Sequence, residues 1–215
     1  ADMSSLSVYD RGKLSFEGKR YLADIEAAKE ANRRMFKGVR KLQAKQKYNK
    51  KAIYRPRTVM TLGNHENRIR HEVARNPALA GFMTMADLGY EEYYQEIYDY
   101  LDPVVIEGIA FSHAFVGGVM GKPMGGVNHA RSILLKNHMS SVCGHSHLFD
   151  YAEDTTVAGT KLQSLVVGCC VEEPPHWTNS QQYQLWTSGL VTLRNVSNGT
   201  FDYEKVSLET LFKYY

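Results

Sequence analysis

The spacing of apolar residues changes along the chain from a helical period to a strand period. Over residues 15–46, apolar side chains recur at steps of three and four positions with no intervening proline. This pattern predicts one long helix, or two helices joined near Gly18 or Gly38. The same period predicts shorter helices at residues 67–75, 91–100 and 128–138.

Strands are expected where short β-branched and aromatic runs are bounded by Gly, Pro or Asn. Early in the chain these runs lie at residues 58–62, 104–111 (as a hairpin) and 140–143. After residue 148 strand patterning dominates, with runs at 149–152, 156–167, 187–196 and 200–206. Asn198-Gly199 favours a type I′ turn, because both residues tolerate positive φ. Residues 169–184 have no clear period and are expected to form a loop.

Composition is that of an ordinary globular protein. The 215 residues are 43% hydrophobic, with no internal repeat and no linker, so we expect one α/β domain spanning residues 1–215. No apolar run approaches the ~20 residues that cross a bilayer, and the first residues lack the features of a signal peptide. The three cysteines, Cys143, Cys169 and Cys170, do not suggest a disulfide framework. A soluble protein of a reducing cytoplasm, with no membrane partner, is expected.

Positive charge is concentrated in one segment. Residues 31–60 contain eleven Lys or Arg and no Asp or Glu. Two interpretations fit: a solvated helix face, because Lys and Arg are good helix formers, or a patch that follows the phosphates of a nucleic acid.

Three short polar motifs each follow a predicted strand. They are Gly-Asn-His-Glu at residues 63–66, Ser-His at 112–113 and Gly-His-Ser-His at 144–147. Carboxyl ends of strands are where α/β sheets place ligands. In extended backbone His145 and His147 would project to the same side. Imidazole nitrogen and amide oxygen suit Mn²⁺, Fe²⁺ and Zn²⁺, and the chain has no Cys-x-x-Cys pair, so these motifs predict a catalytic metal site.

In this order, the three motifs resemble the second half of the signature of calcineurin-like metallophosphoesterases. That signature runs Asp-x-His, Gly-Asp-x-x-Asp, Gly-Asn-His-Asp/Glu, His and Gly-His-x-His, and the resemblance covers residues 58–150. Residues 63–70 are also similar to small phosphoesterases of bacteriophages and bacteria, which implies a bacterial or phage-infected host cytoplasm. The family fold implied is an α/β sandwich of two mixed β-sheets flanked by helices. Its N-terminal strand-helix-strand unit, with the first motifs, is absent from these residues.

The resemblance also implies roles for individual residues. Asn64, His113 and His145 would ligate one ion, and His147 the other. His65 would assist departure of the leaving group while a metal-bridging hydroxide attacks phosphorus. Asp2 would orient His65 if Ala1-Asp2 is the tail of the second motif; otherwise it is an ordinary terminal aspartate. Two divalent ions are expected in the complete domain, Mn²⁺ first, with Fe²⁺, Zn²⁺ and Ni²⁺ as alternatives.

The expected activity is hydrolysis of a phosphate ester, with a nucleic-acid or nucleotide phosphodiester favoured by the basic segment. Without the first two motifs, residues 1–215 are expected to bind at most one Mn²⁺ tightly and to hydrolyse esters feebly. The alternative is a catalytically impaired sandwich module that binds nucleic acid or a protein partner through residues 31–60.

Several other polar residues are weaker candidates for substrate contacts. His71, His129 and His138 are expected on the surface or packed inside, whereas His176 lies in a Pro-rich loop suited to substrate binding. Arg68 and Arg70 are two positions apart on a predicted helix, so at most one of them should point into the site.

Overall fold

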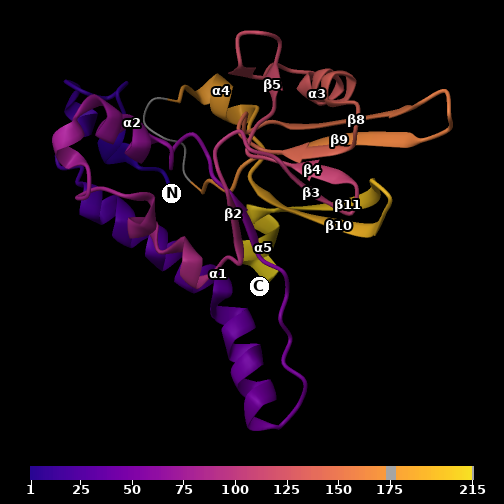
Figure 1. The fold of residues 1–215 in the computed structure, drawn as a ribbon, viewed down its shortest axis with the longest axis horizontal. Helices are drawn as coiled ribbons and strands as arrows, with labels where there is room; N and C mark the ends of the chain where they lie inside the picture. The colour runs from indigo at the N-terminus through magenta and orange to yellow at the C-terminus, as the bar shows by residue number, and fades with distance from the viewer. Residues whose placement is uncertain (173–177, 215) are drawn as a thin grey trace. The chain divides into compact units, whose positions relative to one another are not determined.

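The computed structural model describes residues 1–172 and 178–214, and the chain divides into two compact units, residues 1–98 and 99–215 (Figure 1). Both contain helices and strands, so the predicted α/β class is confirmed. Within residues 1–172 and 178–214, no helix combines the length and the hydrophobicity that crossing a bilayer requires.

The first unit is built on one long helix, α1 (Tyr21–Tyr48). It runs through Gly38 without a break but begins six residues later than predicted, because Gly18 adopts a φ of 78° and turns the chain before Tyr21. Its N-terminal half buries Ile25, Ala28 and Asn32 at helical spacing. The core of this unit is formed by Met3, Leu6, Ile25, Ala28, Leu62, Ile69, Leu88 and Tyr90.

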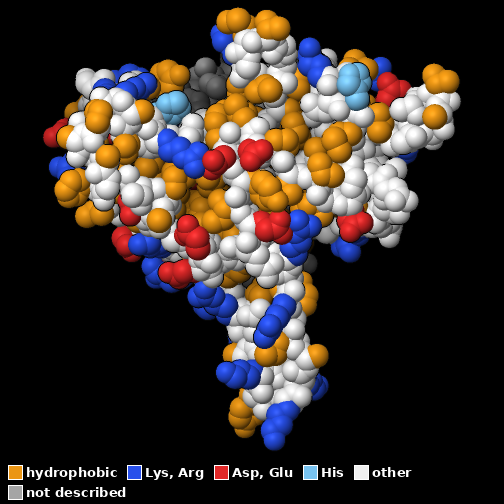
Figure 2. Space-filling view, in the orientation of Figure 1, with side chains coloured by type: hydrophobic (Ala, Val, Ile, Leu, Met, Phe, Trp, Pro, Cys, Tyr) orange, Lys and Arg blue, Asp and Glu red, His pale blue; other side chains and the backbone are white. Residues whose placement is uncertain are grey.

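The second half of α1 forms an arm with the chain that follows it. Gln43 Nε2 donates a hydrogen bond to the Tyr54 carbonyl oxygen at 2.9 Å, and Tyr54 N–H donates to Gln46 Oε1 at 2.8 Å. These bonds hold the returning chain against the helix (Figure 1). We call residues 36–57 the basic arm, and Figure 2 shows Lys and Arg side chains along it.

The remaining elements of the first unit are short. Strand β1 (Val59–Thr61) pairs in parallel with β2 (Glu96–Tyr98), and α2 (Arg68–Arg75) follows the first polar motif. Single 3₁₀ turns occupy Ser4–Leu6, Leu14–Phe16, Pro77–Leu79, Met85–Leu88 and Tyr90–Glu92.

The prediction of a helix at residues 91–100 is wrong. After the turn at Tyr90–Glu92 the chain becomes strand β2, whose residues are in register with β1. Leu62 N–H also donates to the Tyr98 carbonyl oxygen at 2.9 Å. Pairing with β1 supplies backbone hydrogen bonds that outweigh a weak helical preference, as tertiary contacts commonly do.

The second unit is a mixed sheet of five strands in the order β3-β4-β7-β9-β8. Strands β4, β7 and β9 are parallel, and β3 and β8 are antiparallel edges. The bounds are β3 Val104–Ile106, β4 Ile109–Phe111, β7 Ser141–Cys143, β8 Phe149–Thr155 and β9 Lys161–Val167. Around the sheet lie β5 (Val116–Gly117), β6 (Lys122–Pro123), α3 (His129–Asn137), α4 (Ser180–Gln184), β10 (Gly189–Ser197), β11 (Thr200–Ser207) and α5 (Leu208–Tyr214).

Alternate residues of the central strands face opposite layers. Ala110, Cys143 and Val166 pack against helix α3 through Ala130 and Ile133. Their neighbours Ile109, Val142 and Leu165 pack against the β10–β11 hairpin through Phe201, Val191 and Leu193. The sheet of the second unit therefore lies between a helix and a hairpin (Figure 1).

Both predicted hairpin turns are confirmed. Asn198 and Gly199 have φ values of 49° and 83°, and Glu107 and Gly108, between β3 and β4, have 50° and 80°. The two turns touch, because Gly199 N–H donates to the Glu107 carbonyl oxygen at 2.8 Å. A Cβ at Gly108 would lie 2.8 Å from Gly199 N, so glycine is required there. Within the predicted loop 169–184, the structure adds helix α4; residues 173–177 lie outside the described residues.

Gly168, at the end of β9, is a test of this packing. A Cβ there would lie 2.2 Å from the Thr187 carbonyl oxygen, and φ is 79°. We expect Gly168→Ala to lower the free energy of unfolding by about 3 kcal/mol, through overpacking and backbone strain. Gly159→Ala is the control, since Gly159 has a φ of 81° but nothing within 4 Å of the added Cβ. It should cost only about 1 kcal/mol. Urea unfolding followed by circular dichroism measures both; equal losses would contradict the prediction.

Candidate metal and phosphoester site

His113 and His145 lie just beyond the carboxyl ends of two adjacent parallel strands, β4 and β7. The hydrogen bonding between these strands continues past them: Ser112 N–H donates to the Val142 carbonyl oxygen at 3.3 Å, and Gly144 N–H donates to that of His113 at 3.2 Å. As a result His113 Nε2 and His145 Nδ1 are 3.1 Å apart. The structure thus brings together two of the three side chains predicted to share an ion.

The separation of these two nitrogens fits two ligands of one ion. Nitrogens that are each ~2.1 Å from one metal, at angles between ~90° and ~110°, lie about 3.0–3.4 Å apart. Imidazole nitrogens also suit the divalent ions expected from the sequence. The same distance fits a hydrogen bond between one protonated and one unprotonated ring nitrogen.

The backbone of the Gly-His-Ser-His motif is not extended, so the reasoning that strand geometry points His145 and His147 to the same side is wrong. His145 has a φ of 70° and His147 a φ of 64°, and Ser146 N–H donates to the Gly144 carbonyl oxygen at 2.9 Å. The directions of both side chains are therefore set by a tight turn. A left-handed non-glycine residue costs about 1 kcal/mol, and such strain is maintained most often at functional sites.

His147 is held beside Trp186, a residue that the sequence analysis missed. The two ring centroids are 4.1 Å apart with an interplanar angle of 85°, and Thr187 N–H donates to the His147 carbonyl oxygen at 2.9 Å. Trp186 follows helix α4 and lies between the predicted loop 169–184 and the predicted strand 187–196. Nothing in that sequence indicated its contact with the motif.

His129 contacts the Gly-His-Ser-His motif through the Ser146 side chain. Its ring is buried, with 2% of the residue exposed, and Nε2 lies 2.9 Å from Ser146 Oγ. On the other side Nδ1 is 3.9 Å from Asp150 Oδ2, which accepts a hydrogen bond from Ala130 N–H at 2.8 Å. His129 is thus packed inside and fixes the residue between the two motif histidines, whereas His138 is exposed at the end of α3.

In the first unit His65 has a carboxylate partner. His65 Nδ1 lies 2.7 Å from Asp2 Oδ1, and the adjacent Met3 is fully buried in the core. The hydrogen bond from His65 lowers the pKa of the Asp2 carboxyl, and the positive charge of Arg68 lowers it further. Desolvation of the carboxyl raises this pKa but is outweighed. Arg68 also donates a 2.8 Å hydrogen bond to the Asp2 carbonyl oxygen.

Glu66, the last residue of the first motif, holds the loop that carries Asn64 and His65. It is 5% exposed, and its Oε2 accepts a hydrogen bond from Gly63 N–H at 2.9 Å. Its Oε1 accepts one from the Tyr90 hydroxyl at 3.0 Å. This role of Glu66 was not predicted, although its place in the motif was the available signal.

A pocket of about 240 Å³ lies beside Asn64, and its polar lining includes two arginines. Arg68, His71 and Arg75 project into it from one face of α2. Arg70 is not part of this lining, and its side chain is exposed. Glu72, which also lines the pocket, is paired with Arg11. The pocket therefore suits an anionic ligand.

The predicted site residues are divided between the two units: Asp2, Asn64 and His65 in the first, and His113, His145 and His147 in the second. Among the residues that the structure describes, no group of three His, Cys, Asp or Glu side chains is arranged to hold a metal ion. His176 lies outside the described residues. No family model, curated protein or solved structure compared with the chain gives a match.

The contact between His129 and Ser146 can be tested by a double-mutant cycle. We expect His129→Ala to lower the free energy of unfolding by about 3 kcal/mol, because it leaves a cavity and an unpaired hydroxyl. Ser146→Ala should cost about 1 kcal/mol, and the two losses should be coupled by about 1 kcal/mol. His138→Asn, at an exposed left-handed position, should change stability by less than about 0.5 kcal/mol. Strictly additive losses in urea unfolding would show that the contact contributes nothing.

Proposed function

We propose that this chain is a divalent-metal-dependent phosphoesterase with the two-sheet sandwich of calcineurin-like metallophosphoesterases. The observation that carries the proposal is the 3.1 Å separation of His113 Nε2 and His145 Nδ1 at adjacent parallel strand ends. It is supported by the left-handed backbone at His145 and His147, which is costly without a function that needs it.

As the resemblance implies, Asn64, through its side-chain oxygen, His113 and His145 would hold one divalent ion, and His147 would contribute to a second in the complete domain. Mn²⁺ is the expected ion, with Fe²⁺, Zn²⁺ and Ni²⁺ as alternatives. Bound divalent ions supply Lewis-acid stabilisation of a charged phosphoryl group and activate water. Trp186 and Ser146 hold His147 and the motif turn in place.

His65 is proposed to transfer a proton to the leaving oxygen. In this proposal the Asp2 carboxylate accepts a hydrogen bond from Nδ1–H and fixes the plane of the ring, which leaves Nε2 to face the substrate. The pocket lined by Arg68, His71 and Arg75 is proposed to bind the anionic part of the substrate beside Asn64.

Metal binding and turnover should separate these roles. We expect His145→Ala to weaken Mn²⁺ binding more than tenfold, because half of the histidine pair is lost, and to abolish turnover of bis-p-nitrophenyl phosphate. His65→Asn should leave Mn²⁺ affinity within twofold but lower kcat by a factor on the order of 10². Titration calorimetry measures the first effect, and absorbance of nitrophenolate measures the second.

The control is His138→Asn, which removes an exposed imidazole and should alter neither quantity. Turnover that survives excess chelator, or Mn²⁺ binding that is unchanged in His145→Ala, would contradict the proposal. Absence of turnover together with nucleic-acid binding that chelator does not affect would instead support the non-catalytic module that uses residues 31–60.

A further inference from the structure

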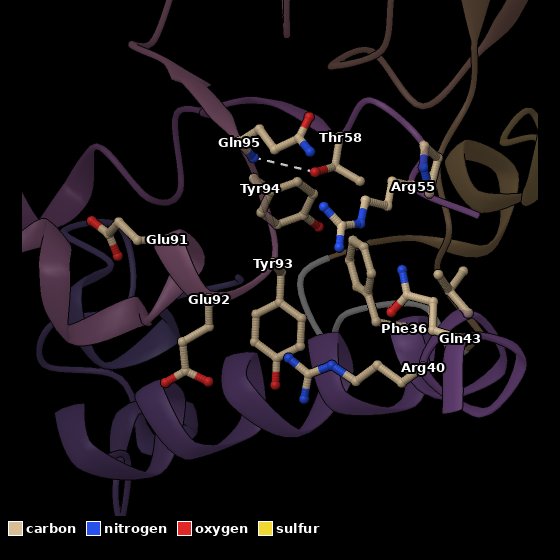
Figure 3. Close-up of a pocket in the computed structure, with 12 residues that line it drawn as sticks. Phe36, Arg40, Gln43, Arg55, Thr58, Glu91, Glu92, Tyr93, Tyr94 and Gln95 are labelled. Atoms are coloured by element: carbon tan, nitrogen blue, oxygen red, sulfur yellow. Dashed lines mark hydrogen bonds between the residues drawn. The ribbon is translucent and has the colours of Figure 1, made fainter. Parts of the chain in front are cut away.

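A second pocket of the first unit, of about 350 Å³, lies between helix α1 and residues 91–95, and none of its lining residues belongs to a polar motif (Figure 3). One wall is Phe36, Arg40 and Gln43 of α1, and the other includes Tyr93 and Tyr94. Arg55, Pro56 and Thr58, on the returning chain of the basic arm and just beyond it, close a third side.

The pocket is lined by aromatic rings. The ring centroids of Phe36 and Tyr93 are 5.2 Å apart at 49°, and those of Phe36 and Tyr94 are 5.4 Å apart at 88°. Because none of these pairs is stacked and all three residues are half-buried, ring surface is left for another planar group. A hydrogen bond from the Tyr94 hydroxyl to the buried Asn32 side chain, at 2.9 Å, fixes one wall.

Two arginines accompany these rings. The Arg40 guanidinium carbon lies 4.5 Å from the centre of the Tyr93 ring, and Figure 3 shows the Arg55 side chain directed toward the aromatic rings. Within residues 1–172 and 178–214, neither arginine forms an ion pair with a carboxylate. The carboxylate of Glu91 points away from the rings in Figure 3. The lining contains two arginines and two glutamates, so its formal charge is close to zero, which suits an uncharged planar group with polar edges better than a free phosphate.

Positive charge continues outside the pocket along the basic arm. Lys41, Lys45, Lys47, Lys50 and Lys51 are exposed there. A cationic track beside an aromatic pocket is the arrangement by which proteins bind single strands: the phosphates follow the charges and a base stacks on the rings. In a duplex both faces of each base are already stacked, so its bases are not available to such a pocket.

We propose that this pocket binds an unpaired base of single-stranded nucleic acid, with Tyr93 and Phe36 stacking on the base, Arg55 bonding its polar edge, and the lysines of the basic arm contacting flanking phosphates. Binding does not depend on the phosphoesterase activity. That the bound strand is also the substrate rests on the proposed function.

The test uses fluorescence anisotropy of labelled dT15 and rU15 in the presence of chelator, which prevents hydrolysis. Tyr93→Leu should weaken binding by about tenfold to hundredfold, the loss of one stacked base. Arg55→Gln, at an exposed position where folding is not at risk, should weaken it at least threefold. Arg20→Gln removes one exposed charge outside the arm and should have no effect.

Stacking can be measured directly with a strand that carries 2-aminopurine. Its fluorescence should fall when it binds the parent chain but not when it is mixed with Tyr93→Leu.

Salt dependence separates the pocket from the arm. Lys50→Gln with Lys51→Gln should reduce the slope of log Kd against log salt by about one, whereas Tyr93→Leu should leave the slope unchanged. Pocket-dependent binding of either strand type supports the proposal.

No binding, equal affinity for a duplex of the same length, or unchanged binding by both Tyr93→Leu and Arg55→Gln would overturn it. Turnover of bis-p-nitrophenyl phosphate with Mn²⁺ should be unaffected in these variants. Loss of the pocket proposal and loss of the phosphoesterase proposal are therefore distinguishable.

Discussion

Parallel pairing of β4 with β7 is the constraint on which the geometry of the second unit depends. Pairing of Ala110 with Ser141 brings the carboxyl ends of both strands to the same edge of the sheet. The hydrogen bond from Gly144 N–H to the His113 carbonyl oxygen continues this pairing into the motifs. Helix α3 makes the connection between the two strands, and its first residue, His129, also contacts the motif turn through Ser146. The same crossover therefore aligns the strands and supports the residues at their ends.

In the first unit a single helix serves two environments. The N-terminal half of α1 is half-buried, and its apolar side chains pack against Met3, Leu62 and Leu88. Its C-terminal half leaves that core, and its surface is dominated by Lys and Arg. The aromatic pocket lies where the two halves meet, so that Phe36 is both near the edge of the core and at the start of the charged surface.

Much of this architecture was predictable because it rests on local chemistry. The Asn198-Gly199 turn follows from tolerance of positive φ, and helix α1 follows from apolar spacing in a sequence free of proline. The pairing of His113 with His145 was predictable because parallel strands present their carboxyl ends at one edge. Contacts that depend on sequence-distant packing were not: strand β2, the placement of Trp186 against His147, and the bond from His129 to Ser146. The left-handed turn at residues 145–147 was also missed, since histidine gives no local signal for it.

The contact between the turns at Glu107–Gly108 and Asn198–Gly199 bears on how the second unit can be altered. Hairpin tips are usually the sites that accept insertions, circular permutation or a bulky label, because they extend into solvent. Here the two tips close on one another across the edge of the sheet and the covering hairpin, with backbone atoms in direct contact. Either tip is consequently a poor place for a tag or a split point. The turn between β8 and β9, where Val157 and Gly159 are exposed, is the better site for a tag or a split point.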